Sequence, residues 1–305
     1  MNALSAWTEV RVLAPIGWHE LVAETLQGGP CTSVAFGRPS LGVAAAPEGF
    51  EYVRTFLPRR DDTDANRARI AARVAELAVT TGDDALAALD IEFKPLPPED
   101  YATSWMKVWK PFRVGRLAVL SPWTQSVPRA ADVTMELEPG ASFGSGRHAT
   151  TRMMLRAIQE RVRPGDRLVD CGTGSGILAV AAALFGAREV FAFDTDPNAE
   201  PNARELAERN GVAGRVRFAT GGFELLAGHA AGFDGLAANI YSDILQQHAA
   251  DFRAALRPGG WFALSGCPAP HAAATDRALA AAGLDVTARP VRGRWHSFLG
   301  VTPGG

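Results

Sequence analysis

Cysteine is scarce in this chain, and its few cysteines are far apart. The 305 residues contain three of them, Cys31, Cys171 and Cys267, and no two share a CxxC spacing. Such a set forms neither a disulfide framework nor a cysteine-based zinc site. We therefore expect three buried thiols, and the sequence predicts no metal site.

Long apolar runs and an excess of one charge are also absent. No uninterrupted apolar stretch approaches the roughly 18 residues of a membrane span, and the start, MNALSAWTEV, lacks the regions of a signal peptide. With 31 basic and 33 acidic residues, the formal net charge of −2 gives no general attraction to nucleic acid or anionic membranes. These features predict a cytoplasmic globular protein with no membrane partner and no direct nucleic-acid partner.

Residues 1–97 have the pattern of a small α+β domain. Strands are predicted at WTEVRVLAP, TSVAFG, FEYVRTFLP and DIEFKPL, and helices at WHELVAETLQGG and DANRARIAARVAELAVTTG. Strand, helix, two strands, helix and strand is the order of a ferredoxin-like fold. That fold has many functions, so the order alone indicates none.

The sequence pattern changes at residues 98–128, which contain Trp105, Trp109 and Trp123. We interpret this run as a linker whose tryptophans pack one domain against the other, with a ring platform for substrate as the alternative. Over residues 129–305 helices and strands alternate. This predicts a mostly parallel sheet covered on both faces, with a ligand site at the carboxyl ends of its strands.

The segment LVDCGTGSGILAVAAALFG runs from a predicted strand through alternating glycines into a helix. Gly172, Gly174 and Gly176 lack a Cβ, which permits a tight turn and the close approach of a ligand. Their spacing is GxGxG, whereas dinucleotide-binding turns carry GxGxxG. The spacing therefore argues against NAD.

The next predicted strand, EVFAFD, ends at Asp194. An acidic residue about 20 positions beyond such a turn is placed to accept hydrogen bonds from ribose hydroxyls. An adenosine-bearing cofactor without a pyrophosphate points to S-adenosylmethionine, with a nicotinamide or flavin domain as the alternative. The chain's end favours the first, because DVTARPVRG and HSFLGVTP predict an antiparallel hairpin similar to that of class I methyltransferases.

The segment PGASFGSGRHATTRMMLRAIQERV predicts a glycine-rich loop leading into a helix. The free N–H groups and positive partial charge of a helix start suit the methionine carboxylate, and Thr151 can add a hydroxyl contact. A purely capping role for Thr150 or Thr151 is the alternative. We expect His148 to be a hydrogen-bonded loop residue rather than a base.

The segment FDGLAANIYSDIL predicts a strand that ends at Asn239 and a helix capped by Ser242. The Asn239 amide is placed to orient an incoming amine at the strand end, and a turn-forming asparagine is the alternative. Nucleic-acid amino-methyltransferases carry asparagine here within an N-P-P-aromatic sequence. Ile240 replaces the first proline, which leaves only Tyr241 to stack on a base.

Several segments together resemble the PrmA family, the ribosomal protein L11 methyltransferases. They are LEPGASFGSGRHATT, VDCGTGSGILAVAAALFGA, FDTDP, ERNGV, LAANI and ALSGC, with EDYATSWMKVWKPFRVG resembling the family's linker. The resemblance implies a class I methyltransferase Rossmann-like sheet at 129–305, a linker at 98–128 and an N-terminal ferredoxin-like α+β domain at 1–97 that recognises the substrate.

The resemblance also implies a function. It is S-adenosylmethionine-dependent methylation of lysine side chains and the N-terminal amine of ribosomal protein L11. Asn239 would be the catalytic residue, and the cofactor contacts would be Thr151, Gly172, Gly174, Gly176, Asp194 and Asn239. The family loop usually reads FGTGTHPTT, so Ser145, Arg147 and Ala149 depart from it, and Thr173 takes a place often held by cysteine.

Two other functions stay open. The first is a methyltransferase of the same fold that acts on another protein lysine or an RNA base, for which salt-dependent RNA binding would be diagnostic. The second is a catalytically inactive, cofactor-binding module associated with the ribosome, against which the intact Gly172, Asp194 and Asn239 argue. A monomer is favoured.

Overall fold

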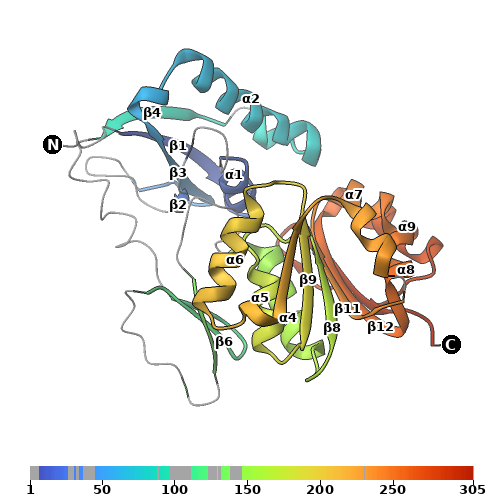
Figure 1. Ribbon diagram of the computed structural model, residues 1–305. Coiled ribbons are helices and arrows are strands. Elements are labelled where there is room, and N and C mark those ends of the chain that lie inside the picture. The colour runs from blue at the N-terminus through green and yellow to red at the C-terminus, as the bar shows by residue number, and fades with distance from the viewer. Residues whose placement is uncertain are drawn as a thin grey trace. The chain divides into compact units, whose positions relative to one another are not determined.

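The computed structural model describes residues 7–26, 31, 34–36, 45–87, 89–96, 111–122, 129, 132–137, 146–229 and 231–304. The chain divides into two compact units. The first comprises Met1–Lys110 with Pro139–Phe143, and the second comprises Pro111–Glu138 with Gly144–Gly305. Figure 1 shows the elements of both, coloured along the chain.

The first unit contains an antiparallel four-stranded sheet with the order β2-β3-β1-β4. Helix α1 packs against β1 and β3. The elements are β1 (Trp7–Pro15), α1 (His19–Leu26), β2 (Val34–Phe36), β3 (Phe50–Pro58), α2 (Asp64–Thr81) and β4 (Ile91–Leu96). This sequence of elements and this strand order agree with the predicted ferredoxin-like fold.

Helix α2 shows why the local sequence forms this element. Its N-cap, Thr63, accepts a hydrogen bond from the Asn66 N–H, and the left-handed Gly82 ends it. The helix buries Ile70, Val74 and Leu77, which recur at the spacing of one helical face.

The second unit begins with a small sheet that the sequence did not predict. Strands β5 (Phe112–Val114) and β6 (Leu117–Leu120) form a hairpin, and β7 (Val133–Glu136) pairs parallel with β6. Of the predicted linker, residues 98–110 and 123–128, which include all three tryptophans, lie outside the described residues.

Asn210 attaches this small sheet to the end of helix α6. Its Oδ1 accepts a hydrogen bond from the Glu136 N–H at 2.7 Å, and its Nδ2 donates to the Glu136 carbonyl at 2.8 Å. The same Nδ2 donates to the Leu206 carbonyl at 2.9 Å. One side chain therefore satisfies both backbone groups of a strand residue, which gives the ERNGV segment a physical role.

The main sheet of the second unit has the order β10-β9-β8-β11-β12-β15-β13, with β14 paired to β15. Strands β8 to β12 are parallel, and β15 lies antiparallel between β12 and β13, as the predicted hairpin required. Its strands are β8 (Arg167–Cys171), β9 (Glu189–Asp194), β10 (Val216–Thr220), β11 (Phe233–Asn239), β12 (Leu256–Pro268), β13 (Asp285–Ala288), β14 (Val291–Arg292) and β15 (Trp295–Val301).

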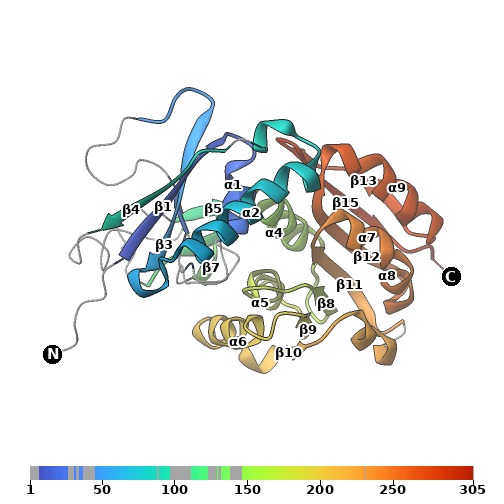
Figure 2. The ribbon, with the colours of Figure 1, turned by 90° about the horizontal axis from the view of Figure 1, so that it is seen from above.

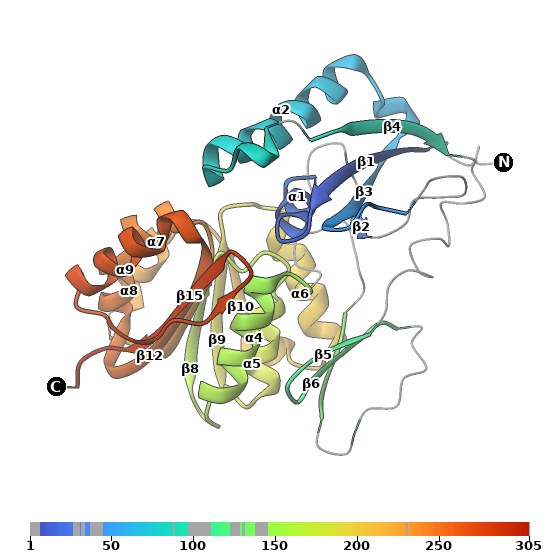
Figure 3. The same ribbon diagram turned by 180° about the vertical axis from the view of Figure 1, so that it is seen from behind.

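Helices cover both faces of this sheet, as Figures 2 and 3 show from two directions. One face carries α4 (Ala149–Arg161), α5 (Ile177–Leu184) and α6 (Ala199–Arg209). The other carries α7 (Ser242–Gln247), α8 (Ala249–Ala255) and α9 (Ala272–Ala281). The chain turns between strands and helices at the sheet's carboxyl edge, so the side chains that follow β8, β9 and β11 gather there.

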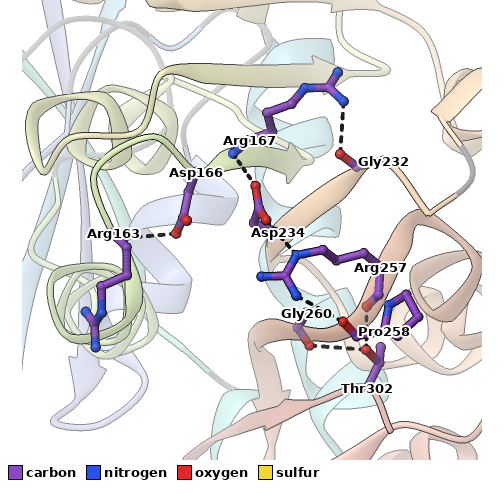
Figure 4. Close-up of polar contacts among 9 residues, drawn as sticks. All are labelled: Arg163, Asp166, Arg167, Gly232, Asp234, Arg257, Pro258, Gly260 and Thr302. Atoms are coloured by element: carbon purple, nitrogen blue, oxygen red, sulfur yellow. Dashed lines mark hydrogen bonds and ion pairs between the residues drawn. The ribbon is translucent and has the colours of Figure 1, made fainter. Parts of the chain in front are cut away.

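A polar network joins the opposite edge, where the strands begin (Figure 4). Asp234 accepts a hydrogen bond from the Arg167 N–H at 2.7 Å and one from Arg257 Nε at 2.6 Å. Partial burial raises the pKa of Asp234, but these two hydrogen bonds and the nearby charges of Arg257 and Arg188 together lower it. Thr302 Oγ1 donates to the Arg257 carbonyl at 2.7 Å, which ties the end of the chain to the same edge.

The core of the second unit is apolar and rich in phenylalanine. Fully buried rings include Phe193, Phe233, Phe252, Phe262 and Phe298. The three cysteines are free and buried, as predicted. Among the described residues, no three His, Cys, Asp or Glu side chains are grouped to hold a metal ion. In the same part of the chain, no helix is long and apolar enough to cross a membrane.

Candidate functional site

The glycine turn between β8 and α5 has the conformation that only glycine adopts readily. Gly172, Gly174 and Gly176 have φ angles of 71°, 52° and 79°. A Cβ on Gly172 would lie 2.4 Å from Ile240 Cγ2, and one on Gly176 would lie 2.7 Å from Ala203 Cβ. The turn therefore approaches both the β11–α7 connection and helix α6 too closely for any other residue.

Backbone hydrogen bonds fix this turn to the adjacent strand. The N–H groups of Gly172 and Thr173 both donate to the Phe193 carbonyl, at 2.9 and 3.0 Å. Asp194, the next residue along β9, accepts a hydrogen bond from the Gly174 N–H through Oδ2 at 2.8 Å. The carboxylate predicted to bind ribose therefore lies directly at the glycine turn.

The Asp194 carboxylate keeps acceptor capacity for a ligand. Its other oxygen, Oδ1, accepts a hydrogen bond from the Asp196 N–H at 2.9 Å. An ionised carboxylate offers about four lone-pair positions, and these two contacts use one on each oxygen. The remaining positions suit the paired hydroxyls of a ribose.

Asn239 and Thr151 meet at the same edge of the sheet. Asn239 ends β11, and its Nδ2 donates a hydrogen bond of 3.3 Å to Oγ1 of Thr151, in the first turn of α4. Thr151 is buried, and Ile240, which follows Asn239, lies against Gly172. The described residues therefore bring the glycine turn, Asp194, Asn239 and the start of α4 into one site.

The helix caps differ from the sequence prediction. The N-cap of α4 is His148, whose Nδ1 accepts a hydrogen bond from the Thr150 N–H at 3.2 Å, so neither threonine is the cap. The N-cap of α7 is Tyr241 rather than Ser242. Ser242 Oγ instead forms a 2.7 Å hydrogen bond with His271 Nδ1, a partner that local sequence does not reveal.

Sequence reasoning missed Asp170, the acidic residue just before the turn. It is 1% exposed, and its Oδ2 accepts a 2.7 Å hydrogen bond from the Thr173 hydroxyl. Its Oδ1 has no hydrogen-bond partner among the described residues. Burial raises the pKa of Asp170 to about 7, although the Thr173 hydroxyl opposes the shift. An acidic residue at the end of an apolar strand is the signal that marks it.

A cavity of about 680 Å³ opens beside the strand end that carries Asp194. Thr195, Gly222 and Ile244 line part of it, and Phe223 forms one wall. The Phe223 ring is stacked on His248 with centroids 3.8 Å apart. Because Thr195 directly follows Asp194, this space adjoins the carboxyl end of β9, with side chains of α7 and α8 on its other side.

The chain matches a known protein family over almost all of its length. The family described as "Ribosomal protein L11 methyltransferase (PrmA)" matches residues 6–302. The chain belongs to this family. The family membership predicted from the motifs is confirmed.

Named members of the family are similar over most of the chain. A ribosomal protein L11 methyltransferase from Pelotomaculum thermopropionicum is 38% identical over 307 residues, covering 95% of this chain and 96% of that protein. One from Symbiobacterium thermophilum is 39% identical over 254 residues, covering 82% of this chain and 81% of that protein.

A solved structure supports the fold. The crystal structure of a ribosomal protein L11 methylase from Lactobacillus delbrueckii subsp. bulgaricus has a TM-score of 0.57 and 27% identity. The match covers 65% of this chain and all of that one. The predicted fold class, a class I methyltransferase sheet with an N-terminal α+β unit, is confirmed.

The family loop before α4 is described only in part. Ser145 lies outside the described residues, whereas Arg147 and Ala149 lie within them. Arg147 is half-buried, and burial, then the neighbouring charge of Arg152, lower its pKa. The departures from the family loop therefore place a partly desolvated cation next to the first turn of α4.

Proposed function

We propose that this chain uses S-adenosylmethionine to methylate ribosomal protein L11 in the cytoplasm, on lysine side chains and the N-terminal amine. The main observation behind the proposal is that four groups lie together at one edge of the main sheet. They are the glycine turn, the Asp194 carboxylate, the Asn239 amide and the start of α4. Membership of the L11 methyltransferase family supports the acceptor.

The residues present fit the cofactor. Gly172 and Gly176 pack tightly against Ile240 and Ala203, which holds the turn in the left-handed conformation that would present its backbone to a ligand. S-adenosylmethionine is a cation at its sulfonium and its ammonium, and the buried Asp170 carboxylate has one oxygen without a partner among the described residues. A cation near that oxygen would stabilise the ionised carboxylate.

Each end of the cofactor has a proposed set of contacts. Asp194 would accept hydrogen bonds from the ribose hydroxyls, with Gly172, Gly174 and Gly176 lining the turn. The start of α4 would attract the methionine carboxylate through the positive end of its helix dipole, with the Thr151 hydroxyl beside it. Asn239 lies 3.3 Å from Thr151 and so at the methionine end, where methyl transfer would occur.

Methyl transfer to an amine requires orientation of the amine more than it requires a group that accepts a proton. When bound, S-adenosylmethionine supplies a methyl group on a sulfonium that is already electrophilic. The amine must be neutral, and at pH 7 deprotonating a lysine of pKa about 10.4 costs about 4 to 5 kcal/mol. Transfer into a partly buried site disfavours the ammonium and reduces that cost. Asn239 would accept a hydrogen bond from the amine and hold its lone pair toward the methyl group.

The N-terminal unit is proposed to recognise the protein substrate. It has an antiparallel sheet, with α1 packed against β1 and β3. It does not contribute any of the proposed cofactor contacts, all of which lie in the second unit. Residues 1–97 would therefore form the substrate-recognition domain, 98–128 the linker and 129–305 the methyltransferase domain, with residues 112–120 of that linker belonging to the small sheet of the second unit.

Labelled methyl transfer tests the acceptor class. The protein is incubated with S-adenosylmethionine carrying a tritiated methyl group and, in parallel, with ribosomal protein L11, a lysine-rich unrelated protein and ribosomal RNA. Label on L11 alone supports the proposal. Label on RNA or on the unrelated protein would replace the proposed substrate, and no label with a cofactor-binding sample would indicate an inactive module.

A further inference from the structure

The ring of Phe112, at the start of β5, lies near two arginines of the second unit. The Arg147 guanidinium carbon is 5.4 Å from the ring centroid, and that of Arg152 is 5.6 Å away. Both distances are within the range of cation–π attraction. Two positively charged side chains therefore lie near the same ring. Arg147 comes from the loop before α4, and Arg152 comes from the first turn of α4.

The same ring touches the backbone next to Arg147. Gly146 has a φ of 72°, and a Cβ there would lie 2.7 Å from both Phe112 Cζ and Ile177 Cδ1. Ile177 is the first residue of α5, immediately after the glycine turn. The backbone at Gly146 is therefore packed between the Phe112 ring and the start of α5, with no room for a side chain.

Hydrogen bonds keep the β5–β6 hairpin and α4 in fixed register. Arg152 Nη2 donates to the Arg113 carbonyl at 2.9 Å, one residue along from Phe112. Near the other end of the helix, the Arg116 N–H donates to Gln159 Oε1 at 2.6 Å. The hairpin is thus bound to α4 at two places, and the Phe112 ring lies against Arg152 of the first turn.

Thr151 lies in that first turn and contacts Asn239. We propose that Phe112 is a positioning residue for the methionine end of the cofactor site. It would hold Gly146, Arg147 and Arg152 so that the start of α4 keeps its place beside the glycine turn. This inference rests on the proposed function, since it assigns Phe112 to the part of that site which holds the amino-acid tail.

Two ligands separate this role from general stability. S-adenosylhomocysteine carries the amino-acid tail, whereas 5′-methylthioadenosine retains the adenosine end and lacks the tail. Calorimetry measures both dissociation constants for the wild type and for Phe112→Ala. We expect Phe112→Ala to weaken S-adenosylhomocysteine binding about tenfold or more, because misplacement of a first turn loses oriented contacts. Binding of 5′-methylthioadenosine should change by less than about twofold, because the Phe112 contacts are with the loop before α4 and its first turn, whereas Asp194 ends β9.

The matched control is Phe93→Ala in the N-terminal unit. The Phe93 ring makes the same kind of contact, with the Arg67 guanidinium 4.9 Å from its centroid. This variant should leave both dissociation constants unchanged. Phe112→Tyr retains the ring and should restore tight binding of S-adenosylhomocysteine.

Gly146→Ala provides a second route to the same result. Its Cβ would press on Phe112 and Ile177, so it should reproduce the selective loss even if Phe112→Ala folds poorly. Equal losses for the two ligands, or no loss for either, in the folded variants would overturn the role of Phe112. Failure of the wild type to bind either ligand would instead overturn the proposed function.

Discussion

Asn239 and Thr151 are 88 residues apart in the chain, yet the Asn239 side chain donates a 3.3 Å hydrogen bond to the Thr151 hydroxyl. The bond joins the end of β11 to the first turn of α4. A hydrogen bond between uncharged groups contributes only about 1 kcal/mol to stability. Its importance is geometric, because it links the amide that would orient the amine to the helix that would hold the methionine tail.

Removing the Thr151 hydroxyl should therefore reduce activity more than stability. Thr151→Val keeps the shape of the buried side chain but leaves the Asn239 amide without this acceptor. We expect kcat/KM for methyl transfer to fall about tenfold, the equivalent of one lost hydrogen bond. Thr151→Ser retains the hydroxyl and should remain close to the wild type. Steady-state kinetics that show equal rates for all three proteins would contradict this role.

Asp194→Asn should weaken the adenosine end of the site. An amide cannot replace the charge-assisted hydrogen bonds that a carboxylate accepts from ribose hydroxyls. We expect S-adenosylhomocysteine to bind about 100-fold more weakly by calorimetry, since a bond to a charged group is worth about 1.5 to 3 kcal/mol. Asp196→Asn, two residues away, is the matched control and should bind normally. Comparable losses in both variants would argue against a specific ribose contact.

The raised pKa of Asp170 predicts an unusual dependence of stability on pH. Burial raises its pKa to about 7 in the folded protein, above the ordinary value of 3.8. The folded state therefore binds this proton more tightly than the unfolded state does. The contribution to stability is fully present below the unfolded pKa and is lost as the pH rises through about 7, at up to about 1.4 kcal/mol per pH unit.

Asp170→Asn isolates this effect. The variant has no proton to lose, so its free energy of unfolding relative to the wild type should increase between about pH 5 and about pH 8. Urea unfolding of both proteins across that range measures the difference, which cancels the titration of other carboxylates. A difference that stays constant with pH would show that Asp170 titrates at its ordinary value.

Asn210 should contribute to stability well beyond an ordinary surface asparagine. Asn210→Ala removes three hydrogen bonds and leaves both backbone groups of Glu136 without these partners. We expect a loss of roughly 2 to 3 kcal/mol in the free energy of unfolding. Asn202→Ala, which removes one exposed hydrogen bond on the same helix, should cost less than about 0.5 kcal/mol. Similar melting temperatures for the two variants would refute this assignment.

The parts of the site that the sequence predicted are set by local pattern. The spacing of Gly172, Gly174 and Gly176 specifies a backbone turn, and the left-handed φ angles of all three confirm that turn. Asp194 and Asn239 were recognisable because each ends an apolar strand, and the carboxyl ends of parallel strands share one edge. Local sequence therefore predicted the main sheet of the second unit and the sheet edge at which these residues gather.

The contacts that the sequence did not predict join segments far apart in the chain. Nothing near Phe112 indicates that two arginines more than thirty residues later would pack on its ring. The predicted cap at Ser242 was wrong, because Tyr241 takes that position, and the alternative cap at Thr150 or Thr151 fails because His148 is the N-cap of α4. Capping preference is decided within a few residues, whereas here tertiary partners such as His271 and Asn239 engage the hydroxyls.

Intact-mass spectrometry of ribosomal protein L11 tests the central claim most directly. Unmodified L11 is incubated with S-adenosylmethionine and either the wild-type protein or Asn239→Ala, at saturating cofactor. We predict that the wild type adds the mass of one methylene group per methyl transferred, on lysines and the N-terminus, and that Asn239→Ala adds far less in the same time. Equal methylation by the two proteins, or none by a wild type that binds the cofactor, would contradict the account.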